Sequence, residues 1–473
     1  MKRNSLLSLM FVVLCCSADL YSEVRLPAVL GSNMVLQQKS EVQVWGWCSP
    51  TEKISVMVDW DTTVYRTAGS RTAKWSVKIK TPDAGGPYKI IINGSNAIVL
   101  ENVMIGEVWI CSGQSNMEWS GDQGLKQTLE EMPQATNTKI RFFYVPKSTA
   151  DHPQDDCKAS WKVCSPEDMK RFSAVGYFFG KKLQQELNAP IGLINSNWSG
   201  TPAEVWTPKE MVENDPALKA AAAKVNVTPW WPVNAGDTYN AMIHPLTNFA
   251  IAGALWYQGE SNTGTWSTYQ SLLTAMIAGW RRAWQKDFPF YYVQIASFAG
   301  YGQNNICALL REAQTKSMSY PNTGMVVISD LVDDLKDIHP KNKIDVALRL
   351  ANWALAETYG KKGIAYKSPM YKSMKAESGK IRIYFDHAES GLTSKGGEPT
   401  EFYIAGADKN FLPAVAKIEG STVVVSHQDV KNPVAVRLGF SNTAMPNLFS
   451  KDGLPANLFR TDDWAVDTEA VKK

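Results

Sequence analysis

Apolar and polar side chains alternate along the first part of the chain. The segments 41–46, 54–58 and 75–79 each place apolar residues at every second position, and turn-forming residues separate them, as at 83–87. Period-two alternation broken by Gly, Pro and Asn is typical of antiparallel strands. The pattern predicts a β domain over residues 23–103.

The pattern changes near residue 104, where the strand candidates become continuous apolar runs: 108–111, 191–194, 251–257, 288–295 and 325–328. Three helical patterns lie between or after them: 174–188, 269–285 and 343–359. Strands buried on both faces that alternate with helices are typical of a parallel sheet covered by helices. We therefore predict an α/β domain over residues 104–366.

Alternation returns in the last part of the chain, for example at 380–385 and 422–425, and predicts a C-terminal β-rich region over 367–473. Three domains are reasonable for 473 residues. No internal repeat or low-complexity segment interrupts this organisation.

The first residues have the order of a secretory signal. Lys2 and Arg3 precede an apolar run at 6–14, and small residues follow at 16–18. We predict a signal peptide over 1–22, cleaved at about 18–22, and export to the periplasm or the extracellular space. The run is too short to cross a membrane, and Leu14 before Cys15 disfavours a lipid anchor.

Composition excludes several classes of protein. With 44% hydrophobic and 20% charged residues the chain is not wholly disordered. A net charge of +3 without a basic block argues against nucleic-acid binding. The 17 Trp and 17 Tyr are expected mainly in cores, although such rings also line sugar sites.

Metal and cofactor chemistry is not expected. The chain has no CxxC pair and no HExxH motif. The acidic run at 330–337 lacks the spacing and the glycine of an EF-hand, so calcium binding is not expected. Cys157 and Cys164 are close enough to bridge, but two free thiols are an equal alternative.

Candidate catalytic groups follow the predicted central strands, because ligands bind at the carboxyl ends of such strands. Ser115 lies in a strand-to-helix turn, where the amide groups of a helix start favour an oxyanion. Gly200 and Gln258 follow the next two strands. The G-x-S-x-G elbow is only half met, since Met117 replaces the second glycine, and a classical α/β-hydrolase therefore fits less well.

A serine nucleophile needs a base, and the base needs an orienting acid. Of five histidines, only His339 lies in a loop that follows a predicted central strand and has carboxylates close by. Ser115 and His339 are therefore the candidate nucleophile and base.

These motifs resemble the sialate O-acetylesterase family of the SGNH hydrolases. The resemblance rests on Gly-Gln-Ser-Asn-Met at 113–117, Trp-Tyr-Gln-Gly-Glu-Ser-Asn at 256–262 and Asp-Ile-His-Pro at 337–340. Further similar segments, among them 33–37 and 310–314, extend it over nearly the whole chain after the signal. It implies a three-layer α/β/α SGNH-like domain with a parallel sheet, flanked by N- and C-terminal β-rich domains.

The resemblance also implies residue roles. Ser115 is the nucleophile, His339 the base, and the oxyanion hole consists of the amides of Ser115 and Gly200 with the side chain of Gln258, for which Asn262 is the alternative. SGNH enzymes commonly place the acid three residues before the histidine, where this chain has Lys336. Asp337, two residues before it, is our choice.

Three other carboxylates remain open as the acid: Asp334, Asp330 and Glu260. Five residues of the family-like segments are expected to bind substrate: Gln114, Asn116, Glu260, Asn262 and His244.

The expected function is that of an exported serine esterase that removes O-acetyl groups from sialic acids through an acetyl-enzyme. Its expected partner is an O-acetylated sugar or glycan, with no nucleic acid and no cofactor. One alternative is an O-acetylesterase for xylan or another acetylated polysaccharide. The other is a carbohydrate-binding protein with an inactive site.

Overall fold

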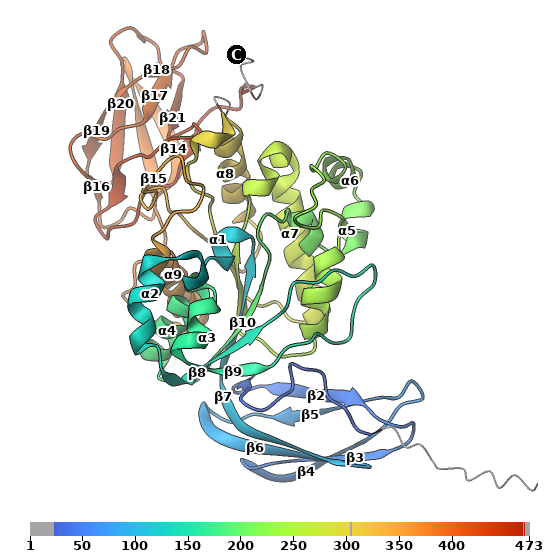
Figure 1. Ribbon diagram of the computed structural model, residues 1–473. Coiled ribbons are helices and arrows are strands. Elements are labelled where there is room, and N and C mark those ends of the chain that lie inside the picture. The colour runs from blue at the N-terminus through green and yellow to red at the C-terminus, as the bar shows by residue number, and fades with distance from the viewer. Residues whose placement is uncertain (1–22, 303–304, 467, 469–473) are drawn as a thin grey trace, which may run out of the picture.

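The computed structural model describes residues 23–302, 305–466 and 468. The predicted signal peptide at 1–22 lies outside the described residues. A central sheet organises the fold (Figure 1). Its strands lie in the order β13 (Thr323–Val326), β12 (Phe290–Val293), β11 (Gly253–Tyr257), β7 (Ala97–Gly113), β10 (Ile191–Asn197), β8 (Asn137–Tyr144) and β9 (Trp161–Cys164). Neighbours along this order are parallel except β8 and β9.

The apolar runs form these inner strands because both of their faces are covered. Every residue of β10 and β11 is buried. In β11, Ala254 and Trp256 belong to one hydrophobic cluster, whereas Leu255 and Tyr257 belong to another. Alternate side chains of a strand point to opposite faces, so each face of the sheet has its own core.

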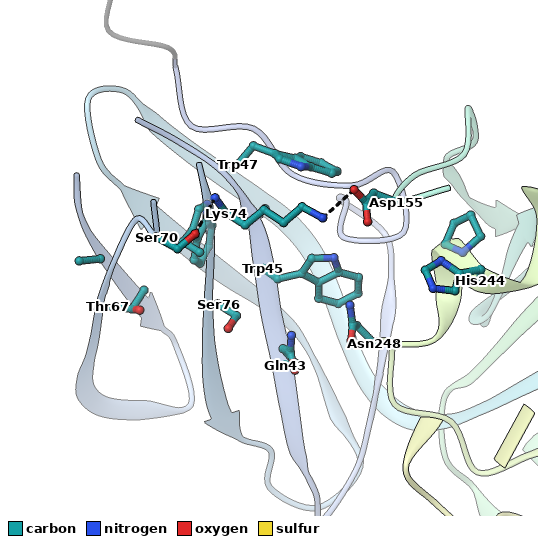
Figure 2. Close-up of a pocket in the computed structure, with 14 residues that line it drawn as sticks. Gln43, Trp45, Trp47, Thr67, Ser70, Lys74, Ser76, Asp155, His244 and Asn248 are labelled. Carbon is teal, nitrogen blue, oxygen red and sulfur yellow. Dashed lines mark hydrogen bonds and ion pairs between the residues drawn. The ribbon is translucent and has the colours of Figure 1, made fainter. Parts of the chain in front are cut away.

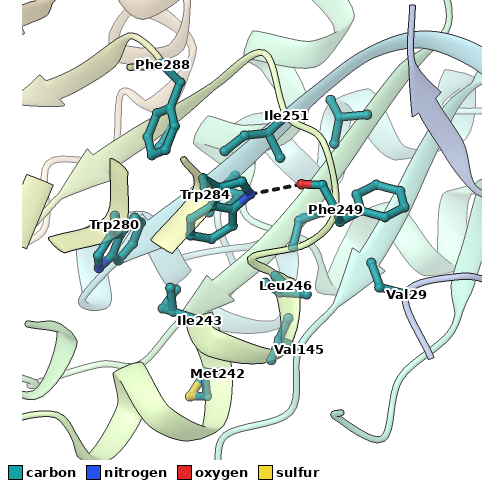
Figure 3. Close-up of a cluster of buried hydrophobic side chains, with 14 of the residues drawn as sticks. Val29, Val145, Met242, Ile243, Leu246, Phe249, Ile251, Trp280, Trp284 and Phe288 are labelled. Atoms are coloured by element: carbon teal, nitrogen blue, oxygen red, sulfur yellow. Dashed lines mark hydrogen bonds between the residues drawn. The ribbon is translucent and has the colours of Figure 1, made fainter. Parts of the chain in front are cut away.

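The longer helices contribute to both cores, and one core continues into the N-terminal β region. Helix α4 (Ala174–Leu187) packs against α9 (Lys343–Trp353), and α7 (Trp266–Trp284) packs against α8 (Ile306–Ser317). Figure 3 shows part of the α7 side, where Trp280 and Trp284 lie among apolar side chains and the Trp284 indole donates to the Phe249 carbonyl at 2.9 Å. The shorter helices are α1 (Ser115–Glu118), α2 (Lys126–Glu131), α3 (Pro166–Arg171), α5 (Lys209–Glu213) and α6 (Pro216–Ala222).

The N-terminal β region is continuous with the central sheet. Its strands are β1 (Val35–Gln37), β2 (Glu41–Trp47), β3 (Lys53–Val58), β4 (Asp61–Ala68), β5 (Lys74–Lys80) and β6 (Gly85–Asn93). The first part of β7 pairs with β6, and its last part pairs with β10 and β11. The boundary that the sequence pattern suggested, between residues 103 and 104, therefore falls within one 17-residue strand.

The C-terminal β region lies beside α8 (Figure 1). Its strands are β14 (Met370–Glu377), β15 (Lys380–Asp386), β16 (Leu392–Ser394), β17 (Phe402–Ala405), β18 (Leu412–Pro413), β19 (Val415–Glu419), β20 (Thr422–Ser426), β21 (Ala435–Leu438), β22 (Leu448–Ser450) and β23 (Phe459–Arg460). The Arg460 guanidinium donates to both carboxylate oxygens of Glu312 on α8, each at 3.0 Å. This bidentate pair attaches the region to the α/β domain.

The structure decides between the two expectations for the cysteines, because Cys157 and Cys164 are both free thiols. Within the part of the chain that the structure describes, no helix is both long enough and apolar enough to cross a lipid bilayer.

Candidate active site

Three loops begin at the same level of the central sheet. The register pairs Gly113 of β7 with Asn197 of β10 on one side and with Tyr257 of β11 on the other. Parallel strands bring their carboxyl ends to one edge. Ser115, Gly200 and Gln258, which follow these strands within three residues, are therefore brought to the same place.

The turn before Ser115 requires a glycine. Gly113 has φ +139°, and a Cβ added to it would lie 2.2 Å from the Tyr257 carbonyl oxygen. Gln114 then caps helix α1, and Ser115 is its first residue. The Ser115 amide has no acceptor within the helix, and the residue is only half-buried.

His339 reaches Ser115 from the loop after β13. Its Nε2 atom lies 2.9 Å from Ser115 Oγ. Asp337 Oδ1 lies 3.4 Å from His339 Nδ1 and accepts the His339 backbone N–H at 2.9 Å. The Trp119 ring stacks on the imidazole at 4.4 Å. In the tautomer with its proton on Nδ1, the histidine can accept the hydroxyl proton of Ser115.

The other three candidate acids are held elsewhere. Asp330 forms a bidentate pair with Arg349, with both contacts at 2.7 Å. Asp334 accepts the Lys336 backbone amide at 2.8 Å, and Glu260 accepts from Asn116 Nδ2 at 2.6 Å. Of the four, Asp337 is the carboxylate beside the imidazole.

The surroundings of His339 keep its imidazole neutral. Burial lowers the pKa of His339, and the nearby positive charge of Lys343 lowers it further, whereas Asp337 acts in the opposite direction. A neutral imidazole at neutral pH is the form that accepts a proton from a serine.

Gly200 and Gln258 follow the two strands that flank β7, and the Gln258 side chain reaches the Gly200 turn. Gly200 has φ +79° and is half-buried, and its turn is closed by Ser261 Oγ, which donates to the Gly200 carbonyl at 2.8 Å. The side-chain amide of Gln258 is buried and donates to the carbonyl of Thr201 at 3.3 Å and to Asn262 Oδ1 at 2.7 Å. Both donors of Gln258 are thus directed at protein acceptors.

Four residues expected to bind substrate have their side chains buried and paired with protein groups. Gln114 Oε1 accepts the Gly259 amide at 3.2 Å. Asn262 accepts the Ala203 amide at 2.9 Å and donates to Glu204 at 2.8 Å. Asn116 and Glu260 pair with each other, and all four residues are less than a tenth exposed. As folded, these side chains are directed into the protein, where each has at least one protein partner.

His244, the fifth expected substrate residue, lies away from Ser115. Its Nδ1 is 2.9 Å from the Gln154 carbonyl oxygen. It lines a pocket beside the N-terminal β region together with Trp45, Trp47 and the Lys74–Asp155 ion pair (Figure 2). Neither Ser115 nor His339 lines that pocket.

Sequence reasoning missed Trp119 and Lys343. Trp119 follows Ser115 by one helical turn, a spacing that places two side chains on one face. Lys343 begins α9, is fully buried and donates to Asn116 Oδ1 at 2.6 Å. Its position four residues after His339 was a weak signal, because a lysine there is ordinarily exposed.

The structure brings a serine, a histidine and an aspartate into the order of a catalytic triad. Among the described residues, no group of three or more His, Cys, Asp and Glu side chains is arranged to hold a metal ion. Because a nucleophile, a base and an orienting carboxylate lie in this order, the arrangement can carry out acyl transfer through Ser115.

Comparison with known proteins gives consistent matches. The family described as carbohydrate esterase, sialic acid-specific acetylesterase matches residues 105–356. The sialate O-acetylesterase of Homo sapiens is 30% identical over 388 residues, which cover 73% of each chain. The mouse protein of that name (Mus musculus) is 28% identical over 430 residues, covering 76% of this chain and 79% of its own.

A solved structure also matches nearly the full length. It is described as a novel carbohydrate acetylesterase, XAC1771, from Xanthomonas citri. It is 36% identical, has a TM-score of 0.86, and the match covers 93% of this chain and 100% of that chain.

The geometry predicts that Ser115 is chemically activated. A fluorophosphonate should label Ser115 covalently, and His339→Ala should slow the labelling by about 10²–10⁴-fold, the contribution expected of a general base. The measurement is the labelling rate, with the modified residue identified by peptide mass spectrometry. His427→Ala is the control, since His427 lies in the C-terminal β region. Equal rates in the wild type and His339→Ala would contradict the assignment.

Proposed function

The chain belongs to the carbohydrate esterase family of sialic acid-specific acetylesterases, and we propose that it removes O-acetyl groups from sialic acids. Family membership makes it a carboxylic ester hydrolase. The observation that carries the proposed mechanism is the 2.9 Å contact between Ser115 Oγ and His339 Nε2 at the carboxyl edge of the sheet.

In the proposed acylation step, Ser115 Oγ attacks the acetyl carbonyl carbon while His339 Nε2 takes the hydroxyl proton. Asp337 orients the imidazole and stabilises its protonated form. The oxyanion of the tetrahedral intermediate accepts hydrogen bonds from the amides of Ser115 and Gly200. The intermediate collapses when the sugar oxygen leaves and takes the proton from His339.

In deacylation, His339 takes a proton from water, whose oxygen attacks the acetyl-enzyme. Acetic acid leaves and ionises to acetate, while the proton on His339 returns to Ser115 Oγ. The expected products are a free sugar hydroxyl and acetate, and no step requires a cofactor.

Gln258 is proposed as the third oxyanion donor. Its amide already lies beside the Gly200 turn, since it bonds the carbonyl of the adjacent Thr201. That bond, at 3.3 Å, is the longer of its two. If one N–H of the Gln258 side chain turned from the Thr201 carbonyl toward the oxyanion, it would supply the side-chain donor that the family resemblance implies. The other N–H would keep its bond to Asn262.

The finer features of the fold and location are also proposals. Two separate cores on the faces of the central sheet support a three-layer α/β/α domain of SGNH type over about 104–366. The signal-like segment at 1–22 supports export to the periplasm or the extracellular space. Four of the residues expected to bind substrate are buried and hydrogen-bonded to the protein: Gln114, Asn116, Glu260 and Asn262. We propose that they hold the loops of the site in place and do not contact the substrate.

A second candidate substrate is an acetylated polysaccharide. The solved relative with 36% identity over 93% of this chain is named only as a carbohydrate acetylesterase, and its identity exceeds the 30% of the human sialate enzyme. The catalytic steps would be unchanged, and only the leaving sugar would differ.

Acetate release separates the two substrates. We expect the wild type to release acetate from O-acetylated sialic acids faster than from acetylated xylan oligosaccharides, measured as kcat/KM.

Ser115→Ala should lower kcat by about 10⁴–10⁶-fold, the range for a triad nucleophile. A mutant within tenfold of the wild type would remove Ser115 from the mechanism. A wild type inactive on every acetyl ester would favour the carbohydrate-binding alternative.

Asp337 and Asp330 form a matched pair for testing the acid. Asp337→Asn should lower kcat by about 10⁴-fold, since the amide cannot hold the imidazole in its reactive tautomer. Asp330→Asn weakens the Arg349 pair and should lower Tm, with kcat kept within about tenfold. The reverse pattern of kcat losses would move the role to Asp330.

Gln258→Leu tests the third donor. If the amide turns to the oxyanion, kcat should fall by about 10²–10³-fold with little change in KM. A lower Tm with kcat within about tenfold would mean that Gln258 only supports Thr201 and Asn262. Steady-state kinetics and thermal unfolding of the same preparation distinguish the two results.

A further inference from the structure

A buried polar cluster lies directly behind the Ser115–His339 pair. Its centre is Asn116, the residue after the nucleophile. Asn116 Nδ2 donates to Glu260 at 2.6 Å and to the Ile338 carbonyl at 3.1 Å. Asn116 Oδ1 accepts from Lys343 Nζ at 2.6 Å. One side chain thus connects helix α1, the loop after β11, the His339 loop and α9.

Lys343 is the unusual member of this cluster. Its side chain is fully buried, and Nζ lies 5.3 Å from the centre of the Tyr257 ring and 5.8 Å from that of Trp119. Lysine is almost never fully buried unless it is paired. Here burial lowers the pKa of Lys343, and the nearby Glu260 carboxylate opposes this shift by favouring the charged form.

Packing alone does not explain this lysine. An apolar side chain would fill the same space without the desolvation cost of an ammonium group. The lysine instead meets a network in which Glu260 Oε2 and Tyr257 Oη have no partner among the described residues. Its contacts end on Asn116, which bonds the carbonyl next to His339. Lys343 is thus connected through Asn116 to the loop that carries His339, the base of the proposed reaction.

We propose that Lys343 is a positioning residue for the esterase reaction: through Asn116 it holds the His339 loop against Ser115, and its positive charge keeps His339 neutral and ready to accept a proton. The proposal rests on the function proposed above. Trp119 contributes by lying against both groups, stacked on His339 and within cation–π distance of Lys343.

The charges around the two groups support this role. Asp337 is the anion that acts on His339, and Lys343 is the cation. Around Lys343, the anions are Glu260, Asp337 and Asp333. Burial lowers the pKa of Lys343 to about 7 against the effect of these anions. The pKa of His339 is lowered from its usual value of 6.5, first by burial and then by the charge of Lys343.

Lys343→Met tests the charge. Removing a cation that disfavours the imidazolium raises the pKa of His339, so the His339 midpoint in an NMR titration should move to higher pH. The acid limb of kcat/KM on an aryl acetate should move in the same direction. His339→Asn identifies the His339 resonance among the five histidines.

Lys341→Met is the matched control. It removes the same charge two residues from His339, but Lys341 is exposed and pairs with Asp333 at 3.6 Å. Both the His339 midpoint and the kinetic limb should stay at their wild-type positions. Lys343→Arg keeps the charge, and should keep the midpoint low even if the larger side chain reduces kcat.

Asn116→Ala tests the connection. It removes the bond to the Ile338 carbonyl and should lower kcat by about 10²-fold with a smaller effect on KM, because the base is displaced while substrate contacts remain. Lys343→Met and Asn116→Ala test different parts of the proposal. If the Lys343→Met protein fails to fold, Lys343→Arg and Asn116→Ala still test it.

The outcomes separate this inference from the proposed function. An unchanged His339 midpoint in folded Lys343→Met, or a midpoint that Lys341→Met moves equally, would overturn the charge role. A lower Tm with unchanged kcat in Asn116→Ala would overturn the positioning role. Absence of acetate release by the wild type would instead refute the esterase proposal, and the NMR titration does not depend on it.

Discussion

The hydrogen bond between Ser115 and His339 joins residues 224 positions apart, and the proposed chemistry depends on its 2.9 Å length. No local turn can bring these residues together. They meet because β7 and β13 belong to one sheet whose inner strands run parallel and end at one edge. The fixed turn at Gly113 and the stacking of Trp119 then set the last few ångströms. A displacement of about 1 Å at such a site can cost about 10²-fold in rate, so the sheet register is itself a catalytic requirement.

The polar residues behind the site are held by the protein. Gln114, Asn116, Gln258 and Asn262 are each buried and bonded to at least two protein groups. In a low-dielectric interior a satisfied hydrogen-bond network favours one arrangement, because every alternative leaves a polar group unpaired. Such a network fixes the loops that carry Ser115, Gly200 and His339. The polar residues of the family motifs therefore hold the loops of the site in position. Trp119 and Trp198, in contrast, are half-buried and stay partly open to solvent.

Much of the fold could be predicted from periodicity alone. The mixed α/β organisation with a mostly parallel sheet and β-rich regions on either side is confirmed, since apolar runs such as 191–194 and 251–257 lie in buried strands or lead into them. Ser115, Gly200 and His339 could be proposed as site residues because each follows a predicted strand. The direction of a side chain could not be predicted, because it depends on partners from distant segments. Asn116 points inward only because Glu260 and Lys343 are there to receive it. The burial of Lys343 and the separate location of His244 depend on tertiary packing in the same way.

The continuity of β7 has a mechanical consequence. Glu107, in the part of β7 between the N-terminal strands and the nucleophile, accepts hydrogen bonds from Gln37, Gln38 and Tyr359 at 2.6–2.9 Å. These contacts connect the N-terminal β region, the strand and the segment after α9. A hinge needs a few residues that can absorb a change in backbone angles, whereas here the connection is a hydrogen-bonded strand with a buried carboxylate at its centre. The N-terminal region and the central sheet are therefore joined by continuous strand pairing and by the contacts of Glu107, and the pocket around Trp45 and His244 lies beside the N-terminal region (Figure 2). Ser115 lies beyond the opposite end of β7, where helix α1 begins (Figure 1).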